Sequence, residues 1–342
     1  MIIFNLATDE NDPLLAFTTD WIIAFHEIAS VTEVISTHVG SYSLPESIKV
    51  YKIGGGNVFR KTIAVVKLVY HGVRIVTTNK NMIVFHHMST YSAAILGPLF
   101  RAKGFKQGLW YSHNRNSLIL RAGSLAMNDI FTPTKDSFPF ESKKLHLVGH
   151  GIDIKKFSHL LADNEDRSGI VSLGRISKVK RLDHLITGLF ESGVSKLDVT
   201  LIGPIFGQDD VYESLVNLGA KKNVTLNFME PVPHTRVAEV LSKYSMCYTG
   251  SPNTVDKSAI EGALMGCFVL SENHNVLQQT GMNEVWKVVG RKAPDTISQQ
   301  IKELSKVESR IDLRQILRLS AIENNNLYLT AGKIFGQLST HD

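Results

Sequence analysis

The stretch GIVSLGRISKVKRLDHLITGLFESG (169–193) contains one complete strand, loop and helix. Its first five residues form a short apolar run that ends near a glycine, which is typical of a buried strand. Its last thirteen residues carry their apolar side chains at helical spacing. The stretch therefore predicts one β-loop-α unit of an α/β sheet.

The same alternation continues through the second half of the chain. We expect strands at 197–204, 223–229, 246–252, 267–272 and 284–290, and helices at 208–221, 234–245, 256–266 and 293–307. Short strands that alternate with helices of 10–15 residues indicate a parallel sheet wound by right-handed crossovers.

The first half alternates less cleanly but also suggests a Rossmann-like unit. We expect strands at 1–7, 32–37, 48–53, 82–87, 107–113 and 129–134, and helices at 15–29, 57–72, 89–103 and 116–127. The boundary is expected within LVGHGIDIKKF (147–157), where a strand, a glycine turn and a basic stretch meet. This organisation predicts domains at 1–150 and 151–311, followed by an amphipathic helical segment within 312–342.

Composition fits two soluble domains with an anionic partner. The 342 residues are 43% hydrophobic and 20% charged, with a net charge of +5. Nucleotides, phosphoesters, anionic lipids and nucleic acids all satisfy this charge. Cys247 and Cys267 lack metal-site spacing, and we interpret them as buried thiols in a reducing cytoplasm. No signal peptide or ~20-residue apolar span is visible, so we expect any membrane contact to be peripheral.

The loops after the strands of the second half are the predicted binding surface. Two facing Rossmann-like units place strand carboxyl ends along a cleft, where open α/β sheets bind ligands. Arg175 and Lys180 flank a turn that enters a helix, an arrangement that suits a diphosphate. The alternative is a solvated basic turn.

The stretch TVDKSAIEGALMGC (254–267) contains a nearly apolar helix with a single carboxylate, Glu261. Burying an unpaired carboxylate is costly, so Glu261 either faces solvent or meets a partner. The two hydroxyls of a ribose would satisfy it. Asp256 or Thr254 is the candidate cap of this helix.

The ordered series LVGHGIDIKKF, VSLGRISKVKRLDHLI, VTLIGP, VTLNFMEPVP and NTVDKSAIEGALMGCFVLS covers 147–275. It resembles the C-terminal half of the family 4 retaining glycosyltransferases. The resemblance implies the GT-B fold: α/β, with two Rossmann-like domains facing across a cleft and a C-terminal crossover helix that packs back on the N-terminal domain. It also implies a UDP- or GDP-sugar donor, no required metal or tightly bound cofactor, and a glycan or lipid-linked acceptor in surface polysaccharide or glycoconjugate synthesis.

Position by position, the resemblance places Arg175 and Lys180 on the diphosphate and Glu261 on the donor ribose. Pro231 and Val232 fall where the backbone contacts the nucleobase. The implied donor-binding residues are Gly174, Gly203, Pro231, Val232, Asn253, Thr254, Val255, Asp256, Lys257 and Glu261.

One departure concerns the donor sugar. Asn253 replaces the first glutamate of the family's E-x7-E segment, which touches that sugar. However, Asp256, Lys257 and Glu261 resemble a D-K-x-x-x-E variant found in bacterial surface-polysaccharide transferases. An altered donor loop is therefore favoured over an inactive enzyme.

In the N-terminal half, His113 follows a strand where the family places a histidine near the transferred sugar, and it is the third predicted catalytic residue beside Arg175 and Lys180. A lone histidine can also be purely structural. Further candidates for acceptor contact are His86, His87, Asn114 and Arg115.

The segment 57–74 is basic and amphipathic if helical. It is suited to the inner face of an anionic membrane, or it is an ordinary surface helix. The rival functions are a catalytically silent GT-B subunit that binds a partner or glycan, and a GT-B epimerase or phosphorylase. Nucleic-acid binding is disfavoured, because the basic residues are scattered and no aromatic-basic platform is present.

Overall fold

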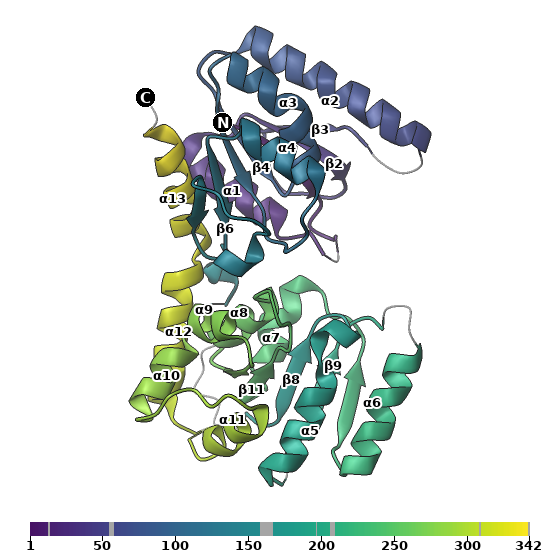
Figure 1. The fold of residues 1–342 in the computed structure, drawn as a ribbon, viewed down its shortest axis with the longest axis vertical. Coiled ribbons are helices and arrows are strands. Elements are labelled where there is room, and N and C mark those ends of the chain that lie inside the picture. The colour runs from purple at the N-terminus through teal and green to yellow at the C-terminus, as the bar shows by residue number, and fades with distance from the viewer. Residues whose placement is uncertain are drawn as a thin grey trace. The chain divides into compact units, whose positions relative to one another are not determined.

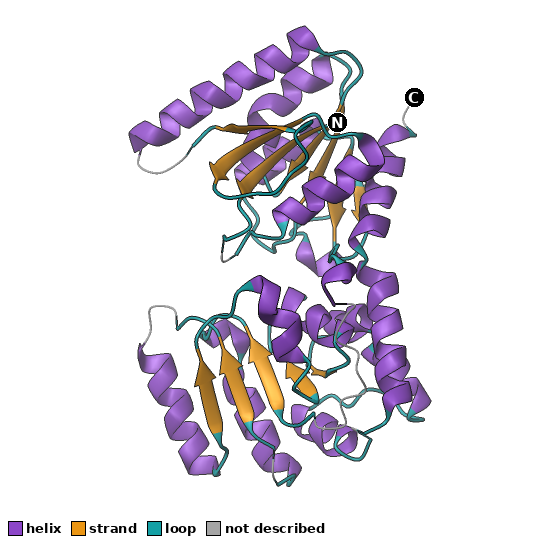
Figure 2. Cartoon of the chain, turned by 180° about the vertical axis from the view of Figure 1, so that it is seen from behind, coloured by secondary structure: helices purple, strands orange, loops and turns teal. Residues whose placement is uncertain are grey.

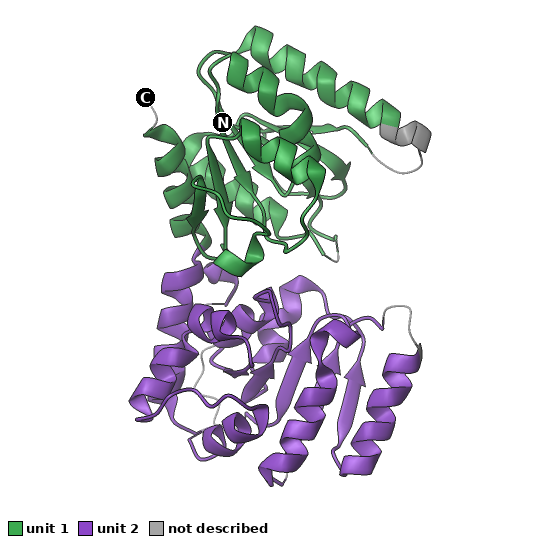
Figure 3. Cartoon of the chain, viewed as in Figure 1, with its two compact units in different colours: residues 1–151, 327–342 green, residues 152–326 purple. Residues whose placement is uncertain are grey.

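The computed structural model describes residues 1–12, 14–54, 58–157, 167–195, 197–205, 209–307 and 309–340, without the side chains of 58–61 and 209. The chain forms two compact units (Figure 3). Unit 1 comprises Met1–Gly151 and Leu327–Asp342, and unit 2 comprises Ile152–Asn326. Each unit is a parallel sheet with helices on both faces (Figure 2), which confirms the predicted α/β class.

The sheet of unit 1 has the strand order β3-β2-β1-β4-β5-β6-β7. Its parallel strands are β1 (Ile2–Thr8), β2 (Glu33–Val39), β3 (Lys49–Lys52), β4 (Ile83–His87), β5 (Lys106–Trp110), β6 (Asp129–Thr132) and β7 (Leu145–Leu147). In register, Ile3 of the central strand lies opposite Val34 and Phe85. The strand order switches between β1 and β4: β2 and β3 lie on one side of β1, and β4 to β7 follow on the other.

Two helical layers cover this sheet. One holds α2 (Val58–Thr78), α3 (Thr90–Ala102) and α4 (Leu118–Ala126), and the other holds α1 (Thr18–Ala29) and α13 (Leu327–Ser339); the turn η1 (Lys135–Ser137) follows β6. Successive strand residues point to opposite faces. Accordingly, Phe4 packs with Leu68 of α2, whereas Ile3 packs with Trp21 of α1 and Leu327 of α13.

The sheet of unit 2 has the order β10-β9-β8-β11-β12, and its strands β8, β9 and β11 are labelled in Figure 1. Its strands are β8 (Ile170–Leu173), β9 (Val199–Ile202), β10 (Leu226–Met229), β11 (Met246–Tyr248) and β12 (Phe268–Leu270). The central strands are buried on both faces, which explains their continuous apolar sequences. The chain reverses direction across the sheet between β8 and β11.

The helices of unit 2 surround this sheet. They are α5 (Leu182–Ser192), α6 (Asp209–Lys222), α7 (Val237–Leu241), α8 (Lys257–Leu264), α9 (His274–Thr280), α10 (Met282–Val288), α11 (Ile297–Leu304) and α12 (Ile311–Asn325), with 3-10 turns η2 (Ile154–Phe157), η3 (Lys178–Lys180) and η4 (His234–Arg236). The thiols of Cys247 and Cys267 are buried and unbridged, as expected.

Three secondary-structure predictions were wrong in detail. Residues 284–290 belong largely to helix α10 instead of a strand, because Met282, Val285 and Trp286 are buried at helical spacing. The expected helix at 234–245 is only η4 and the short α7. The C-terminal segment contains two helices, α12 in unit 2 and α13 in unit 1. They separate at Asn326, whose backbone is extended and bridges to Ile152.

Candidate functional site

The carboxyl ends of β8 and β11 form the topological switch point of unit 2, where open parallel sheets bind ligands. The loop after β8 leads through η3 into α5, and the loop after β11 leads into α8. These loops carry Lys180 and Asp256, and α8 carries Glu261. The fold therefore groups side chains that are far apart in the sequence.

Lys180 is paired with a carboxylate. Its Nζ lies 2.7 Å from Oδ2 of Asp256, and both side chains are more than four-fifths buried. The hydroxyls of Thr249 and Ser251 also donate to Asp256 Oδ2, the latter at 2.8 Å. Asp256 immediately precedes α8 but makes no side-chain capping bond, so its carboxylate orients Lys180 instead.

The electrostatics of Asp256 keep this pair charged. Burial by itself raises the pKa of the carboxyl, but the ammonium of Lys180 and the two hydroxyl hydrogen bonds outweigh burial and lower the pKa. An ammonium held by one carboxylate retains two further N–H donors. Lys180 is thus fixed in place and able to donate to an incoming anion.

Glu261 is buried and paired, which answers the question raised by its apolar helix. It is 5% exposed, and its Oε1 lies 3.1 Å from Nε2 of His234. A carboxylate only accepts hydrogen bonds, so Nε2 of His234 is the donor. His234 begins η4, in the loop that follows β10 and contains Pro231 and Val232. The bond therefore connects the predicted nucleobase loop to the predicted ribose carboxylate.

The thiol of Cys247 lies beside helix α8, where its Sγ donates to the carbonyl oxygen of Ser258 at 3.8 Å. Burial, then the nearby Cys267 thiol, and then the negative charges of Glu261 and Asp256 raise the pKa of the Cys247 thiol, while Lys180 opposes them. Cys247 lies in β11, the strand whose following loop carries Asp256. Its buried, raised-pKa thiol is structural and not a nucleophile.

Two glycines allow the loops after β8 and β9 to approach each other. Gly203 has a φ of +147°, and a Cβ built on it would lie 2.1 Å from the carbonyl oxygen of Gly174. Gly174 also has a positive φ, and its N–H donates to the carbonyl of Ile202 at 2.9 Å. A side chain at position 203 would displace the loop that carries Lys180.

The loop before α8 is held by Asn273, which lies in the loop after β12 and caps the N-terminus of α9. The amide of Asn273 donates to the carbonyl oxygens of Ser251 and Thr254, at 3.1 and 3.4 Å. Val255 is buried, whereas Asn253 is exposed on the outer part of the loop. Asn253, which the resemblance in sequence assigns to the donor sugar, is therefore accessible to a ligand.

The other residues predicted for the donor lie on the same loops. Arg175 and Pro231 are exposed, and Val232 and Lys257 are half-buried. Sequence reasoning missed His234, Thr249, Ser251 and Asn273, which orient the predicted residues. The position of His234, two residues after Val232, was the available signal.

In unit 1, His113, Asn114 and Arg115 are exposed in the loop after β5. His86 and His87 instead lie in the core, 0% and 2% exposed. His86 stacks on Phe4 and His87 on Trp21, and burial lowers the pKa of His86 to about 3. This packing argues against the acceptor contact expected for His86 and His87, so we do not retain it.

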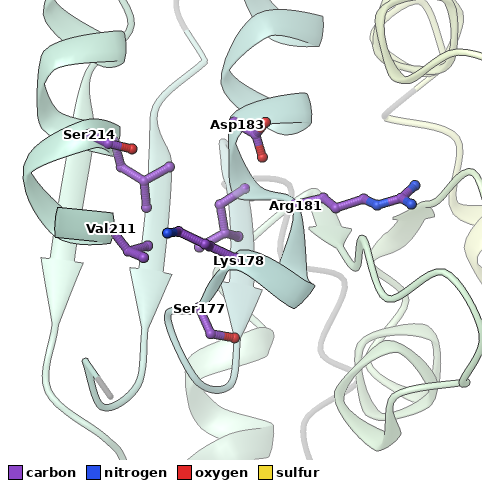
Figure 4. Close-up of a pocket in the computed structure, with 8 residues that line it drawn as sticks. Ser177, Lys178, Arg181, Asp183, Val211 and Ser214 are labelled. Carbon is purple, nitrogen blue, oxygen red and sulfur yellow. The ribbon is translucent and has the colours of Figure 1, made fainter. Parts of the chain in front are cut away.

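A pocket of about 290 Å³ lies beside the loop after β8 (Figure 4). Its lining comes from η3 and the starts of α5 and α6: Ser177, Lys178, Arg181, Leu182, Asp183, Val211, Ser214 and Leu215. Lys178 extends toward Val211 and also pairs with Asp210 at 3.0 Å. The lining includes none of the predicted donor residues, so we assign the pocket no role in donor binding.

Within the described ranges, no group of three or more His, Cys, Asp or Glu side chains is arranged to hold a metal ion. The chemistry available at the switch point is that of one oriented ammonium, Lys180, together with hydroxyls and two buried carboxylates, Asp256 and Glu261. Such a set binds a phosphate and a polyhydroxyl group.

No protein-family model and no curated protein sequence matches this chain. Several solved structures, however, are similar to it. HepE of Anabaena, in complex with UDP and glucose, superposes with a TM-score of 0.73 at 12% identity, over 99% of this chain and all of HepE. A glycosyltransferase of Rickettsia africae gives 0.71 at 12% identity, over 100% and 99% of the two chains. WaaG, a glycosyltransferase involved in lipopolysaccharide biosynthesis, gives 0.61 at 11% identity, over 99% and 100%. The chain therefore has the GT-B fold.

Proposed function

We propose that this protein is a glycosyltransferase that takes a sugar from a nucleotide-diphosphate donor. The observation that carries the proposal is the placement of an oriented ammonium, Lys180, and a buried carboxylate, Glu261, around the switch point of unit 2. The structural neighbours support it, because HepE has been crystallised with UDP and with UDP-glucose.

In this proposal the residues divide the donor between them. Lys180 and Arg175 bind the diphosphate, Glu261 accepts hydrogen bonds from the ribose hydroxyls, and the backbone at Pro231 and Val232 contacts the base. Asn253 and the loop up to Lys257 meet the sugar. Cleavage of the glycosidic bond leaves negative charge on the diphosphate, and cations fixed beforehand stabilise that charge without reorganisation.

The finer assignments follow from the resemblance in sequence. We propose UDP or GDP as the nucleotide, retention of the anomeric configuration in a hexosyl transfer, and no metal requirement. We assign donor binding to unit 2 and acceptor binding to unit 1. The acceptor is a glycan or a lipid-linked glycan of surface polysaccharide synthesis, with His113 near the sugar and Asn114 and Arg115 beside the acceptor. The protein acts in the cytoplasm, peripherally on the membrane.

Calorimetric titration with UDP and GDP tests the donor site. The Lys180→Met variant should bind the preferred nucleotide about 10- to 100-fold more weakly, because a charge-assisted hydrogen bond contributes about 1.5–3 kcal/mol. Lys178→Met is the matched control, since Lys178 lies in the same turn but pairs with Asp210. The proposal would be contradicted if wild-type protein bound neither UDP nor GDP, or if Lys180→Met and Lys178→Met lost the same amount of nucleotide affinity.

Asn253 favours a second candidate, a catalytically silent protein that binds nucleotide sugars or glycans. Release of nucleoside diphosphate from UDP- and GDP-sugars, with and without lipid-linked acceptors, separates the two. An enzyme releases it with acceptor present; a silent subunit binds nucleotide without turnover.

A further inference from the structure

Helix α2 of unit 1 is apolar on two opposite faces. Its inner face is buried in the core, with Leu68 3% exposed and Ile75 fully buried. Its outer face exposes large apolar side chains: Ile63, Val66, Val69, Tyr70 and Val73, with Val66 and Tyr70 more than 60% exposed. We call these five residues the α2 stripe.

The α2 stripe is continuous along the helix. Val66, Val69, Tyr70 and Val73 stand at positions i, i+3, i+4 and i+7, the spacing of one helical face. A surface helix normally presents polar side chains on its outer face, and an extended apolar patch there marks an interaction site. The neighbouring helices α3 and α4 belong to the same layer of unit 1 (Figure 1), and they also expose Tyr91, Leu118 and Leu125.

The charge of this layer identifies the partner. Between Glu46 and Asp129 the sequence contains no acidic residue in 82 positions, although the chain has 32. The same segment contains twelve Lys and Arg, so its formal charge of +12 leaves −7 for the rest of a chain whose net charge is +5. Helices α2, α3 and α4 all lie within it. Lys67 is exposed on α2, and Lys80 is exposed just beyond its end.

We infer that the α2 stripe and its surrounding lysines dock onto an anionic lipid bilayer surface. Apolar side chains enter the boundary between headgroups and acyl chains while lysines contact the anionic headgroups. A second copy fits poorly, because a symmetric interface would bring the exposed Lys67 and Lys80 of one copy against the same basic segment of the other. A nucleic acid would match the positive charge, but its phosphate backbone would not bury the exposed valines of the α2 stripe. Among the residues that the structure describes, no helix is both long and apolar enough to cross a membrane, so docking is peripheral.

Co-sedimentation of the full chain with lipid vesicles tests this inference, which does not depend on the donor site. The protein should sediment with vesicles of equimolar phosphatidylglycerol and phosphatidylcholine, and not with pure phosphatidylcholine. Val66→Ser with Tyr70→Ser should weaken partitioning about tenfold or more. Lys67→Gln and Lys80→Gln should each weaken it about fivefold and reduce its sensitivity to salt.

Matched controls come from unit 2. Leu319→Ser on α12 removes an apolar side chain that is 62% exposed, and Lys302→Gln on α11 removes an exposed lysine; neither should change partitioning. The inference is overturned if wild-type protein ignores anionic vesicles, or if the controls lose as much as the α2 variants. A lipid-free dimer that the Val66 and Tyr70 changes dissociate would instead assign the stripe to a second copy. RNA binding with vesicle partitioning unaffected by those changes would also overturn it.

Discussion

Replacing His234 by alanine should weaken recognition of the donor ribose without weakening recognition of the diphosphate. His234 Nε2 donates to Glu261 Oε1 at 3.1 Å, and it connects the loop after β10 to helix α8. If Glu261 holds the ribose, His234 is a positioning residue that fixes one carboxylate oxygen and so directs the other. Its removal leaves a buried carboxylate free to rotate.

The size of the effect follows from the exposure of the two side chains. A hydrogen bond to a charged group contributes about 1.5–3 kcal/mol. The side chain of Glu261 is 6% exposed, but that of His234 is 32% exposed, and solvent screens the bond from that side. We therefore take the lower end, about 1.5 kcal/mol, which corresponds to roughly a tenfold change in an equilibrium constant.

The assay compares a nucleoside diphosphate with its 2′-deoxy analogue, using UDP or GDP, whichever binds more tightly. Wild-type protein should prefer the ribonucleotide, and His234→Ala should reduce that preference roughly tenfold. His234→Gln should restore part of it, because the glutamine amide can also donate. Arg236→Ala is the control, since Arg236 lies in the same turn but pairs with Glu239.

Two results would refute the reasoning in different ways. If wild-type protein bound the ribonucleotide and its 2′-deoxy analogue equally, Glu261 would not be the residue that binds the ribose. If His234→Ala weakened the binding of both nucleotides equally and left the preference for the ribonucleotide unchanged, His234 would have only a structural role. Failure of both nucleotides to bind at all would contradict the donor site itself.

Three further predictions concern the loops at the switch point. Lys180→Met should lower the free energy of unfolding by about 2–3 kcal/mol, because it strands the buried Asp256 carboxylate, and adding Asp256→Asn should recover part of the loss in urea titrations. The folded-state pKa of Asp256 lies below its ordinary 3.8, so the ionised carboxylate stabilises the fold above about pH 4, and this stabilisation is lost as the pH falls through the lowered pKa. The difference in free energy of unfolding between wild type and Asp256→Asn, measured by urea unfolding, should therefore become smaller at acidic pH. A difference that does not change with pH would contradict the pairing of Asp256 with Lys180. Gly203→Ala should cost about 2 kcal/mol or more in thermal unfolding, since its Cβ would strike the carbonyl of Gly174, whereas Gly193→Ala, with a positive φ but open space, should cost only about 1 kcal/mol.

Much of the fold was predictable because buried parallel strands have a clear signature. The apolar runs at β8, β9, β11 and β12 lie between helical segments, and this alternation indicates a parallel sheet. Prediction failed where an apolar run fits both periodicities. Residues 284–288 belong to a helix in which Met282, Val285 and Trp286 are buried on one face, and the choice between helix and strand was made by their packing in unit 2.

The residues proposed for the donor site come from the sequence and stay predictions, whereas the contacts among them come only from the structure. The ordered motifs indicated Lys180, Asp256 and Glu261, because their spacing survives in the sequence. Their partners were not predictable, since His234 lies 27 residues from Glu261 and Lys180 lies 76 residues from Asp256. His86 and His87 end a strand, as site residues often do, and only the structure shows that both side chains are buried in the core.

The sequence by itself determined the alternation of strands and helices, the loops that carry the charged residues, and the acid-free segment around α2. These are local properties, set by periodicity and composition along the chain. Only the tertiary structure decided which charges meet. Asp256 orients Lys180, and His234 holds Glu261, because strand order brings the loops after β8, β10 and β11 to one edge of the sheet. The tertiary structure also decided that α2 has an exposed apolar face, because a different set of its apolar residues packs against the sheet.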